Sequence, residues 1–593
     1  MLRPKGHARR RWDLLLALAA IAVLMAPMVL TDSTFGGDWP GHLWLVQMQA
    51  RNISYLGHPS LFVQSSLGAF EPWYAFYGGT LYSFVGALAV LSGGHTLAMY
   101  VLSFAMAMAM AYGGFVWIAR QTGSLRGWPA HIGGFVFVSS AYYISDLYAR
   151  GAWPETVATS SIPLVVASGL WLLRAERWRV GPVAAFVFAV VLFTGSHNIT
   201  LLYGSVFLVL LCLSLAVAVG REGLPSPRRG AAVLGLAVLA GAVNLWFLLP
   251  DLVYQGRTTI GHSFTAPPAI AGGLPLSRLL DPVRDSRVPG FPTLDMQIPT
   301  LAVVWCIAVL AVAWRGLPRR WRRLAVALAL PGLPFLLVLA IPELWHALPK
   351  LLWAVQFPYR LLTYVDFSVV GLVMVAVVAM LGMTRTRARG LLLVLGAVFA
   401  LAEGAQAIDQ EWSTPSSLHS RSEVFPGGSK LPDYWIRFAT YLEFQDVSLP
   451  VISATIPELP GVTVYNGQGA NVVPVPVTER PRDGYAVTLN PPKDGTVNTD
   501  VISGPYLVAV HGAKFVGRTP YSELVMQVNR NPHGPTRVTF STARTWPIVL
   551  GKWVTVLALL SLAALLAVLA LRQLAARARG GSSRAWTRRR PAS

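Results

Sequence analysis

The stretch "WDLLLALAAIAVLMAPMVLTDSTFGGDWPGHLW", residues 12–44, decides the class of this protein. Its first part, residues 12–30, is an apolar run long enough to cross the hydrocarbon core of a bilayer as a helix. An acid and a base, Asp38 and His42, follow shortly after it, four residues apart. Ionisable groups beside a membrane are costly unless they are paired or line a wet cavity. The stretch therefore predicts a functional loop at the end of a membrane span.

Composition extends this reading to most of the chain. The 593 residues have a mean hydropathy of +0.52, with 54% hydrophobic and only 13% charged residues. Apolar runs occur at residues 12–30, 79–93, 97–119, 128–147, 156–173, 180–196, 199–220, 230–250, 298–314, 324–342, 361–383, 391–407 and 549–571. We expect a polytopic α-helical membrane protein rather than an ordinary soluble one.

The net charge of +21 is explained by topology, not by nucleic acid. Lys and Arg cluster at the termini and between apolar runs, which by the positive-inside rule places these connections in the cytoplasm. An odd number of apolar runs lies between Arg11 and Arg120, so one of them cannot cross, and the short run 79–93 is the weakest. About twelve crossings remain, with both termini cytoplasmic, the first helix retained, and a long outer loop at residues 31–96.

A change of composition marks a second domain. Between residues 408 and 548, short β-branched segments are separated by Gly, Pro, Asn and Asp. The segments are "VISATIPEL", "GVTVYNG", "NVVPVPVTER", "GYAVTL", "LVAVHGAKFVG", "LVMQVNR" and "TRVTFSTA". This pattern predicts an extracytoplasmic β-rich domain resembling a sandwich. It follows a transmembrane domain at 1–407 and precedes a last transmembrane helix at 549–571 and a basic cytoplasmic tail at 572–593, which suits anionic lipid.

The first outer loop carries the leading candidate site. Asp38 and His42 fall near the N-terminal end of a predicted helix, where they could act as a pair or where Asp38 could simply cap the helix. Glu71 is a second acid in the same loop. It stands in "GAFEPWYAFYGG", whose aromatic residues could stack on a sugar or sit in an interfacial belt.

Other polar groups fall at the outer ends of later spans. Asp146, Arg150 and Glu155 stand in "YISDLYARGAWPETVATSSIPLVV", at the end of one predicted span and the start of the next. Arg150 and Glu155 could bind a substrate or merely pair with each other. "TGSHNITLLYG" places His197 and Asn198 on an outer turn, and "QFPYRLL" places Arg360 at the start of another span. Polar groups at one depth on several helices predict a lined cavity.

Motifs for cofactors are sparse. A zinc site built from Asp38, His42, His58 and Glu71 would lack any paired ligand spacing. A Mg or Mn ion held by Asp38 and Glu71 against a phosphate is left open. The sequence has no P-loop, Rossmann fingerprint or nucleophile elbow, so we expect no nucleotide or redox cofactor and an already activated substrate.

The motifs "GGDWPGHLW", "DLYARGAWPETVATSSIPLV", "GSHNITLLYG", "NLWFLLPDL" and "QFPYRLL" resemble a bacterial membrane family labelled 6-pyruvoyl-tetrahydropterin-synthase-related, akin to YfhO-like proteins. The resemblance spans most of residues 10–410. The histidine zinc site of soluble pterin synthases has no counterpart here. More broadly, the acidic first loop, many spans and C-terminal β domain resemble the C-fold (GT-C) glycosyltransferases.

That resemblance implies a function. It suggests a membrane enzyme that transfers a sugar from a polyprenyl-phosphate donor to a cell-envelope glycan or lipid at the outer face of the bacterial cytoplasmic membrane. Asp38 matches the catalytic first-loop acid of these enzymes, although the tight acid pair of some members is missing. His42 would orient Asp38, and Arg150 or Arg360 would stabilise the departing phosphate.

Two other functions are compatible with the same residues. A transporter or flippase of lipid-linked sugars would use the cavity without bond chemistry, and would be expected to carry charges on broken helices at the bilayer midplane. A non-catalytic envelope assembly protein would bind a partner through its β domain. In that case Asp38 and Arg150 would be replaceable.

Overall fold

A computed structural model describes most of the chain. The described residues are 6–33, 35–65, 68–220, 223–257, 274–284, 294–355, 357–413, 462–465, 472–475, 477–479, 484–489, 495–502, 507–518, 523–528 and 531–587. The predicted strand in "VISATIPEL", residues 451–459, lies outside them.

Helices account for most of the described residues. Among the described residues, eight segments are long and apolar enough to span a membrane, or nine if one bent pair counts as a span. The eight are α1 (Gly6–Leu30), α5 (Thr96–Gln121), α8 (Trp153–Arg174), α10 (Asn198–Val219), α16 (Arg319–Ala329) with α17 (Leu333–Ala340), α18 (Leu362–Leu381), α19 (Thr386–Ser413) and α22 (Trp546–Thr587). The chain is a multi-pass helical membrane protein.

Shorter helices fill the remaining apolar runs. α11 (Pro227–Ala242) and α12 (Leu245–Tyr254) form the pair, bent by 78°. α4 (Gly79–Leu91), η1 (Trp128–His131) with α6 (Ile132–Val138), α9 (Val180–Ser196) and α15 (Thr300–Ala313) are apolar but short. Every apolar run predicted from the sequence thus contains a helix. The total of about twelve crossings, and the non-crossing role of residues 79–93, stay predictions.

The burial of each helix shows where the core lies. In α18, 83% of the apolar window is buried, whereas in α19 only 11% is. A helix that is apolar all round and buried all round belongs at the centre of a bundle, while a helix apolar all round and exposed suits contact with lipid. α18 therefore stands at the centre, and the short helix η7 (Pro358–Leu361) directly before it carries part of the candidate site.

The first outer loop is itself structured. α2 (Trp39–Leu56) begins with Pro40 in its first turn, where a missing N–H costs nothing, and ends at Gly57, whose φ of +77° is the left-handed C-cap conformation. A hairpin of β1 (Val63–Ser65) and β2 (Gly68–Glu71) follows, then the short helix α3 (Trp73–Phe76). The loop thus returns to the bundle before α4.

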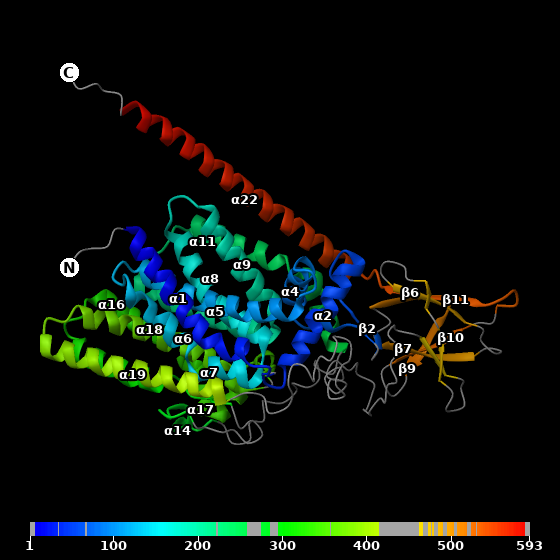
Figure 1. Ribbon diagram of the computed structural model, residues 1–593, viewed down its shortest axis with the longest axis horizontal. Coiled ribbons are helices and arrows are strands. Elements are labelled where there is room, and N and C mark those ends of the chain that lie inside the picture. The colour runs from blue at the N-terminus through cyan, green and yellow to red at the C-terminus, as the bar shows by residue number, and fades with distance from the viewer. Residues whose placement is uncertain are drawn as a thin grey trace.

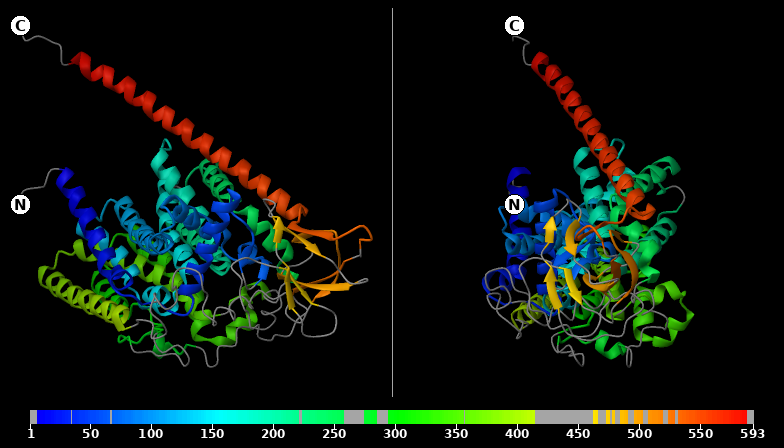
Figure 2. Two further views of the ribbon diagram at one scale, coloured as in Figure 1. Left: turned by 45° about the vertical axis from the view of Figure 1, so that its right-hand side comes forward. Right: turned by 90° about the vertical axis from the view of Figure 1, so that its right-hand side faces the viewer.

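The strands form three sheets at one end of the molecule (Figures 1 and 2). Those from the C-terminal region are β3 (Val462–Tyr465), β4 (Val472–Val475), β5 (Val477–Glu479), β6 (Gly484–Leu489), β7 (Gly495–Ile502), β8 (Val508–His511), β9 (Lys514–Arg518), β10 (Glu523–Val528) and β11 (Thr536–Thr542). The sheets have the orders β1-β2-β7-β10-β9, β5-β6-β11-β8 and β3-β4.

Two features of the strands differ from the sequence reading. β2 of the first loop pairs in parallel with β7 of the C-terminal region, at Ala69 and Val501, so the two outer segments share a sheet. β7 itself, "GTVNTDVI", was not predicted, because its Asn and Asp residues are typical of turns.

α19 continues past residue 407 to Ser413, so the helical part ends later than the predicted domain boundary.

Both chain ends point away from the sheets. In Figure 1 and in the left view of Figure 2, the start of α1 and the end of α22 lie at the end of the molecule opposite the strands. α22 leaves the sheets beside α12 and extends away from the helical body, toward the end of the molecule where α1 begins. The cytoplasmic side for both termini and the outer side for the β strands stay predictions.

Candidate active site

Asp38 is fixed by backbone contacts rather than by its side chain. Its N–H donates to the carbonyl oxygen of Arg150 at 3.0 Å. It occupies the N-cap position of α2, yet its carboxylate makes no capping hydrogen bond. The interpretation of Asp38 as a simple helix cap is therefore wrong for this structure, and the carboxylate is left available.

Two glycines make this close approach possible. A Cβ added to Gly36 would lie 2.2 Å from the carbonyl carbon of Arg150, and one added to Gly151 would lie 2.3 Å from the carbonyl oxygen of Phe35. Both glycines also have positive φ, +65° and +66°. Only glycine fits these positions without strain. The segment before α2 is thus locked against the turn after Arg150.

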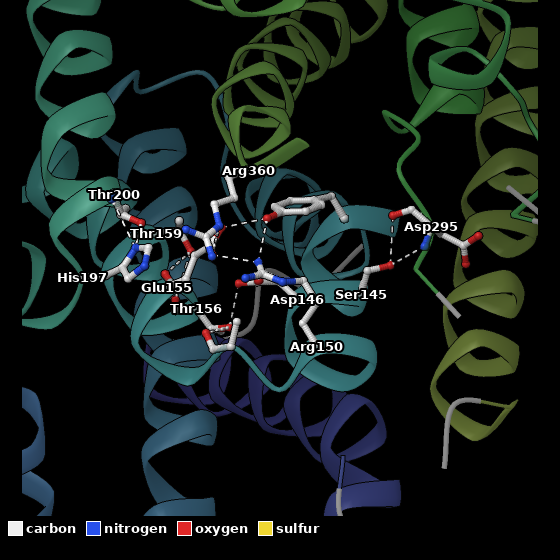
Figure 3. Close-up of polar contacts among 12 residues, drawn as sticks. Ser145, Asp146, Arg150, Glu155, Thr156, Thr159, His197, Thr200, Asp295 and Arg360 are labelled. Carbon is white, nitrogen blue, oxygen red and sulfur yellow. Dashed lines mark hydrogen bonds and ion pairs between the residues drawn. The ribbon is translucent and has the colours of Figure 1, made fainter. Parts of the chain in front are cut away.

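Arg150 sits in a buried cluster of charges (Figure 3). It ends the π-helix η2 (Ser145–Arg150), an element that is frequent at functional sites. Its Nη1 lies 2.6 Å from Asp146 Oδ1 and 2.8 Å from Glu155 Oε2. The hydroxyl of Tyr142 donates to the other oxygen of Glu155 at 2.8 Å. The predicted Arg150–Glu155 pair exists, and it is one part of a larger network.

Arg360 joins this network from the start of the α18 span. It lies in η7 (Pro358–Leu361), and its Nε is 3.1 Å from Glu155 Oε2. The guanidinium carbon lies 5.3 Å from the ring centroid of Phe357, a cation–π contact. No hydrogen bond from its terminal nitrogens to another described residue is found. Arg360 Nε therefore forms an ion pair with Glu155 without hydrogen-bond geometry, whereas Arg150 is hydrogen-bonded to two carboxylates.

Asp38 lies within electrostatic range of this cluster. Burial raises the pKa of Asp38 above its ordinary value of 3.8, against the opposing effect of the positive charges of Arg150 and Arg360. A carboxylate with a raised pKa is a stronger base than an ordinary one, and nearby cations favour its ionised form. The structure thus brings together Asp38, Arg150, Glu155 and Arg360, four of the residues predicted from sequence.

His42 is placed differently from the prediction. Its Nδ1 lies 2.6 Å from the hydroxyl of Tyr82, and no hydrogen bond joins it to Asp38. Burial, followed by the charges of His197 and Arg150, lowers the pKa of His42 to about 3. His42 is a neutral imidazole near Asp38, and an orienting bond from it to Asp38 is absent between these two described side chains.

His197 and Asn198 face different groups. The ring of His197 packs edge-on against that of Tyr77, with ring centroids 5.7 Å apart. His197 lies next to the charged cluster of Glu155 and Arg360 (Figure 3). Asn198 instead donates to Asp251 Oδ2 at 2.6 Å and to the carbonyl of Phe76 at 3.1 Å. Asn198 therefore ties α3 to α12, a positioning contact rather than a binding one.

A metal site receives little support from the described residues. Within them, no group of three His, Cys, Asp or Glu side chains is arranged to hold an ion. The side chain of Glu71 lies outside the described residues, although its backbone pairs with Val63 in the first hairpin. His58 is exposed in the turn after α2. The Mg or Mn ion stays an open prediction.

Sequence reasoning selected Asp146 together with Arg150 and Glu155, and the structure pairs Asp146 with Arg150 at a helical spacing of four residues. It missed three aromatic members of the site, Tyr142, Phe357 and Tyr359, which carry no such signal. Phe357 and Tyr359 stack at 5.3 Å, and Tyr359 lies 5.6 Å from the guanidinium carbon of Arg150. These aromatic rings flank both arginines.

Comparisons with known proteins give structural neighbours only. No family model and no curated protein sequence matches the chain. The arabinofuranosyltransferase AftD from Mycobacteria aligns with 69% of this chain and 27% of its own, at 17% identity and a TM-score of 0.45. The chain thus spans about a quarter of AftD.

Two further neighbours are similar to a comparable degree. ArnT from Cupriavidus metallidurans aligns over 73% of this chain and 69% of its own, at 14% identity and a TM-score of 0.42. An oligosaccharyltransferase from Archaeoglobus fulgidus aligns over 76% of this chain and 62% of its own, at 14% identity and a TM-score of 0.42. The neighbours include membrane glycosyltransferases, and the resemblance to a YfhO-like family stays a prediction.

Proposed function

We propose that this protein is a membrane glycosyltransferase of the C-fold type. It transfers a sugar from a polyprenyl-phosphate donor to a cell-envelope glycan or lipid at the extracytoplasmic face. One observation carries the proposal: the carboxylate of Asp38 makes no capping bond and is held by its own backbone against Arg150, within range of Arg360. A base beside a cation is what sugar transfer from a phosphate requires.

In the proposed reaction one proton moves to Asp38 and one electron pair leaves with the phosphate. Asp38 accepts the proton of the acceptor hydroxyl, whose oxygen forms a bond to the anomeric carbon of the donor sugar. The bond from that carbon to the phosphate oxygen breaks, and the polyprenyl phosphate leaves with the electron pair. No oxidant, reductant or nucleotide takes part.

Arg360 is the better partner for the leaving phosphate. Its terminal nitrogens are uncommitted among the described residues, and guanidinium groups bind phosphate oxygens in two-pronged fashion. Arg150 already neutralises Asp146 and Glu155. We assign Arg150 to holding the site together, and Arg360 to the charge that develops on the leaving group.

A lipid-linked donor suits the location of the site. Asp38 follows the first apolar helix and Arg360 precedes α18, so both lie at helix ends on the predicted outer side, where nucleotide sugars are not made. The sequence has no nucleotide-binding motif. ArnT, one of the similar proteins, has also been seen bound to undecaprenyl phosphate. We propose the same class of ligand here.

The test is the variant Asp38→Asn in the full-length protein reconstituted in membranes, with polyprenyl-phosphate sugars and envelope glycan as substrates. Asparagine keeps the shape but cannot take the proton, so transfer should fall by about 100-fold or more, with thermal stability nearly unchanged. Asp32→Asn, an exposed acid of the same loop, is the matched control. Wild-type transfer by Asp38→Asn, or transport of the donor without a product, would defeat the enzyme proposal.

A further inference from the structure

Tyr77 is the centre of a group of aromatic and imidazole rings beside Asp38. It follows α3 directly and is held there by Gly78, where an added Cβ would lie 2.2 Å from the carbonyl oxygen of Ser196. Gly78 also has a φ of +56°, so a larger residue would be strained both by the close carbonyl group and by its own backbone conformation. This contact brings Tyr77 against His197, the residue after Ser196, with ring centroids 5.7 Å apart.

Two buried nitrogens in this group have no partner. The ring of His42 stacks parallel to Tyr77 at 6.0 Å, and that of Trp73 meets Tyr77 edge-on at 6.4 Å. His42 Nε2 and Trp73 Nε1 are both buried and make no hydrogen bond within the described part of the chain. Buried polar atoms in native proteins are almost always paired, so two unpaired nitrogens that converge on one ring indicate a ligand with hydrogen-bonding groups.

His197 adds a third ring nitrogen, and its tautomer is set by a hydrogen bond. Its Nδ1 accepts from the backbone N–H of Thr200 at 3.3 Å, so in the neutral ring the hydrogen resides on Nε2. Burial, together with the charge of Arg360, lowers the pKa of His197 to about 3, as burial does for His42. Both imidazoles are therefore uncharged at physiological pH.

We propose that His42, Trp73, Tyr77 and His197 form a subsite for an uncharged, hydroxylated sugar ring. This proposal rests on the proposed function and specifies its substrate class. The indole and imidazole nitrogens bond sugar hydroxyls, and the rings of Tyr77 and Trp73 pack on the apolar faces of the sugar. Asp38, four residues before His42, then lies at the edge of the bound sugar.

The charges of the site explain the selection of a neutral sugar. A charged group buried without a counter-charge costs far more than a hydroxyl. The four subsite residues carry no formal charge. Arg150 is committed to Asp146 and Glu155, and Arg360 is assigned to the phosphate. An amino sugar or a uronic acid would therefore bring a charge that the subsite does not balance, since the charge of Asp38 already faces Arg150 and Arg360.

Binding to the intact protein in nanodiscs tests this selection. The probes are farnesyl phosphate and its glycosides with a neutral pentose or hexose, an amino sugar and a uronic acid, measured by isothermal titration. We expect the neutral glycosides to bind at least tenfold more tightly than the charged ones. Trp73→Phe keeps an aromatic ring but removes the N–H. It should therefore weaken the binding of neutral glycosides about threefold to tenfold and leave the affinity for farnesyl phosphate unchanged.

A matched variant controls for the loss of an indole N–H. Trp345 in η5 (Pro342–Ala347) also has a buried, unpartnered Nε1, and Trp345→Phe should change no affinity. Equal affinity for charged and neutral glycosides, or no effect of Trp73→Phe, would overturn the subsite. Binding of a neutral methyl glycoside without binding of farnesyl phosphate would support the subsite and refute the lipid-phosphate donor.

Discussion

The backbone N–H of Asp38 donates to the carbonyl oxygen of Arg150 at 3.0 Å. This bond joins the first outer loop to the end of a π-helix, two segments that are far apart in the chain. It fixes the distance between the proposed base and the cluster of Arg150, Glu155 and Arg360. A base must lie within hydrogen-bonding reach of its proton, so this contact sets the geometry of the site.

Gly36→Ala should inactivate the protein, whereas Gly37→Ala should not. A Cβ at Gly36 would lie 2.2 Å from the carbonyl carbon of Arg150, and one at Gly37 meets nothing within 4 Å. The first change must push Asp38 away from Arg150, and a displacement of about 1 Å can cost about 100-fold in rate. Transfer assays on the two neighbouring variants give the comparison. Equal activities would show that this contact does not position Asp38.

Arg150→Ala should mainly lower the stability of the protein, whereas Arg360→Ala should mainly lower its transfer rate. Removal of Arg150 leaves Asp146 and Glu155 without their main partner and should cost about 3–5 kcal/mol of stability. Removal of Arg360 leaves Glu155 still paired with Arg150, so stability should fall less, by about 1–2 kcal/mol, while transfer falls by about 100-fold or more. Thermal unfolding in detergent and transfer rates separate the two roles. A folded, active Arg360→Ala would contradict the assigned role.

The pH dependence of transfer should report Asp38. A general base works when deprotonated, so the rate falls as pH drops through its pKa, which burial raises above 3.8. Arg360 opposes this rise, so Arg360→Gln should move the acidic limb of kcat/KM to higher pH. The pKa values of His42 and His197 are lowered to about 3, so no limb near 6.5 is expected from either. A limb that stays in place in Arg360→Gln would argue against Asp38 as the titrating group.

The topology can be tested by cysteine labelling of intact cells. Asn531, exposed before β11, should become labelled by an impermeant maleimide when replaced by Cys. Ser226, exposed in the Arg-rich connection before α11, should be labelled as Cys only after permeabilisation. Cys212 is exposed and should first be changed to Ser, whereas Cys306 is buried. The reverse pattern would invert the membrane orientation and place the site in the cytoplasm.

The sequence by itself determined the class of the protein and most of its elements. Apolar runs matched to bilayer thickness predict helices wherever they occur, because a backbone in lipid must satisfy its own hydrogen bonds. Alternating β-branched segments indicated most C-terminal strands, although β7, with its Asn and Asp, was missed. Asp38, Arg150, Glu155, His197 and Arg360 could also be selected, since ionisable groups at span ends are few and costly.

Only the tertiary structure decided which of these residues contact one another and which are left unpaired. It placed Glu155 between two arginines, left Asp38 without a cap, paired His42 with Tyr82 and turned Asn198 toward Asp251. It also joined β2 of the first loop to β7. Sequence patterns show which face of an element is apolar, but they do not show which polar groups will meet. That depends on which side chains lie close together in the buried region, because a buried charge is costly unless a neighbouring group neutralises it.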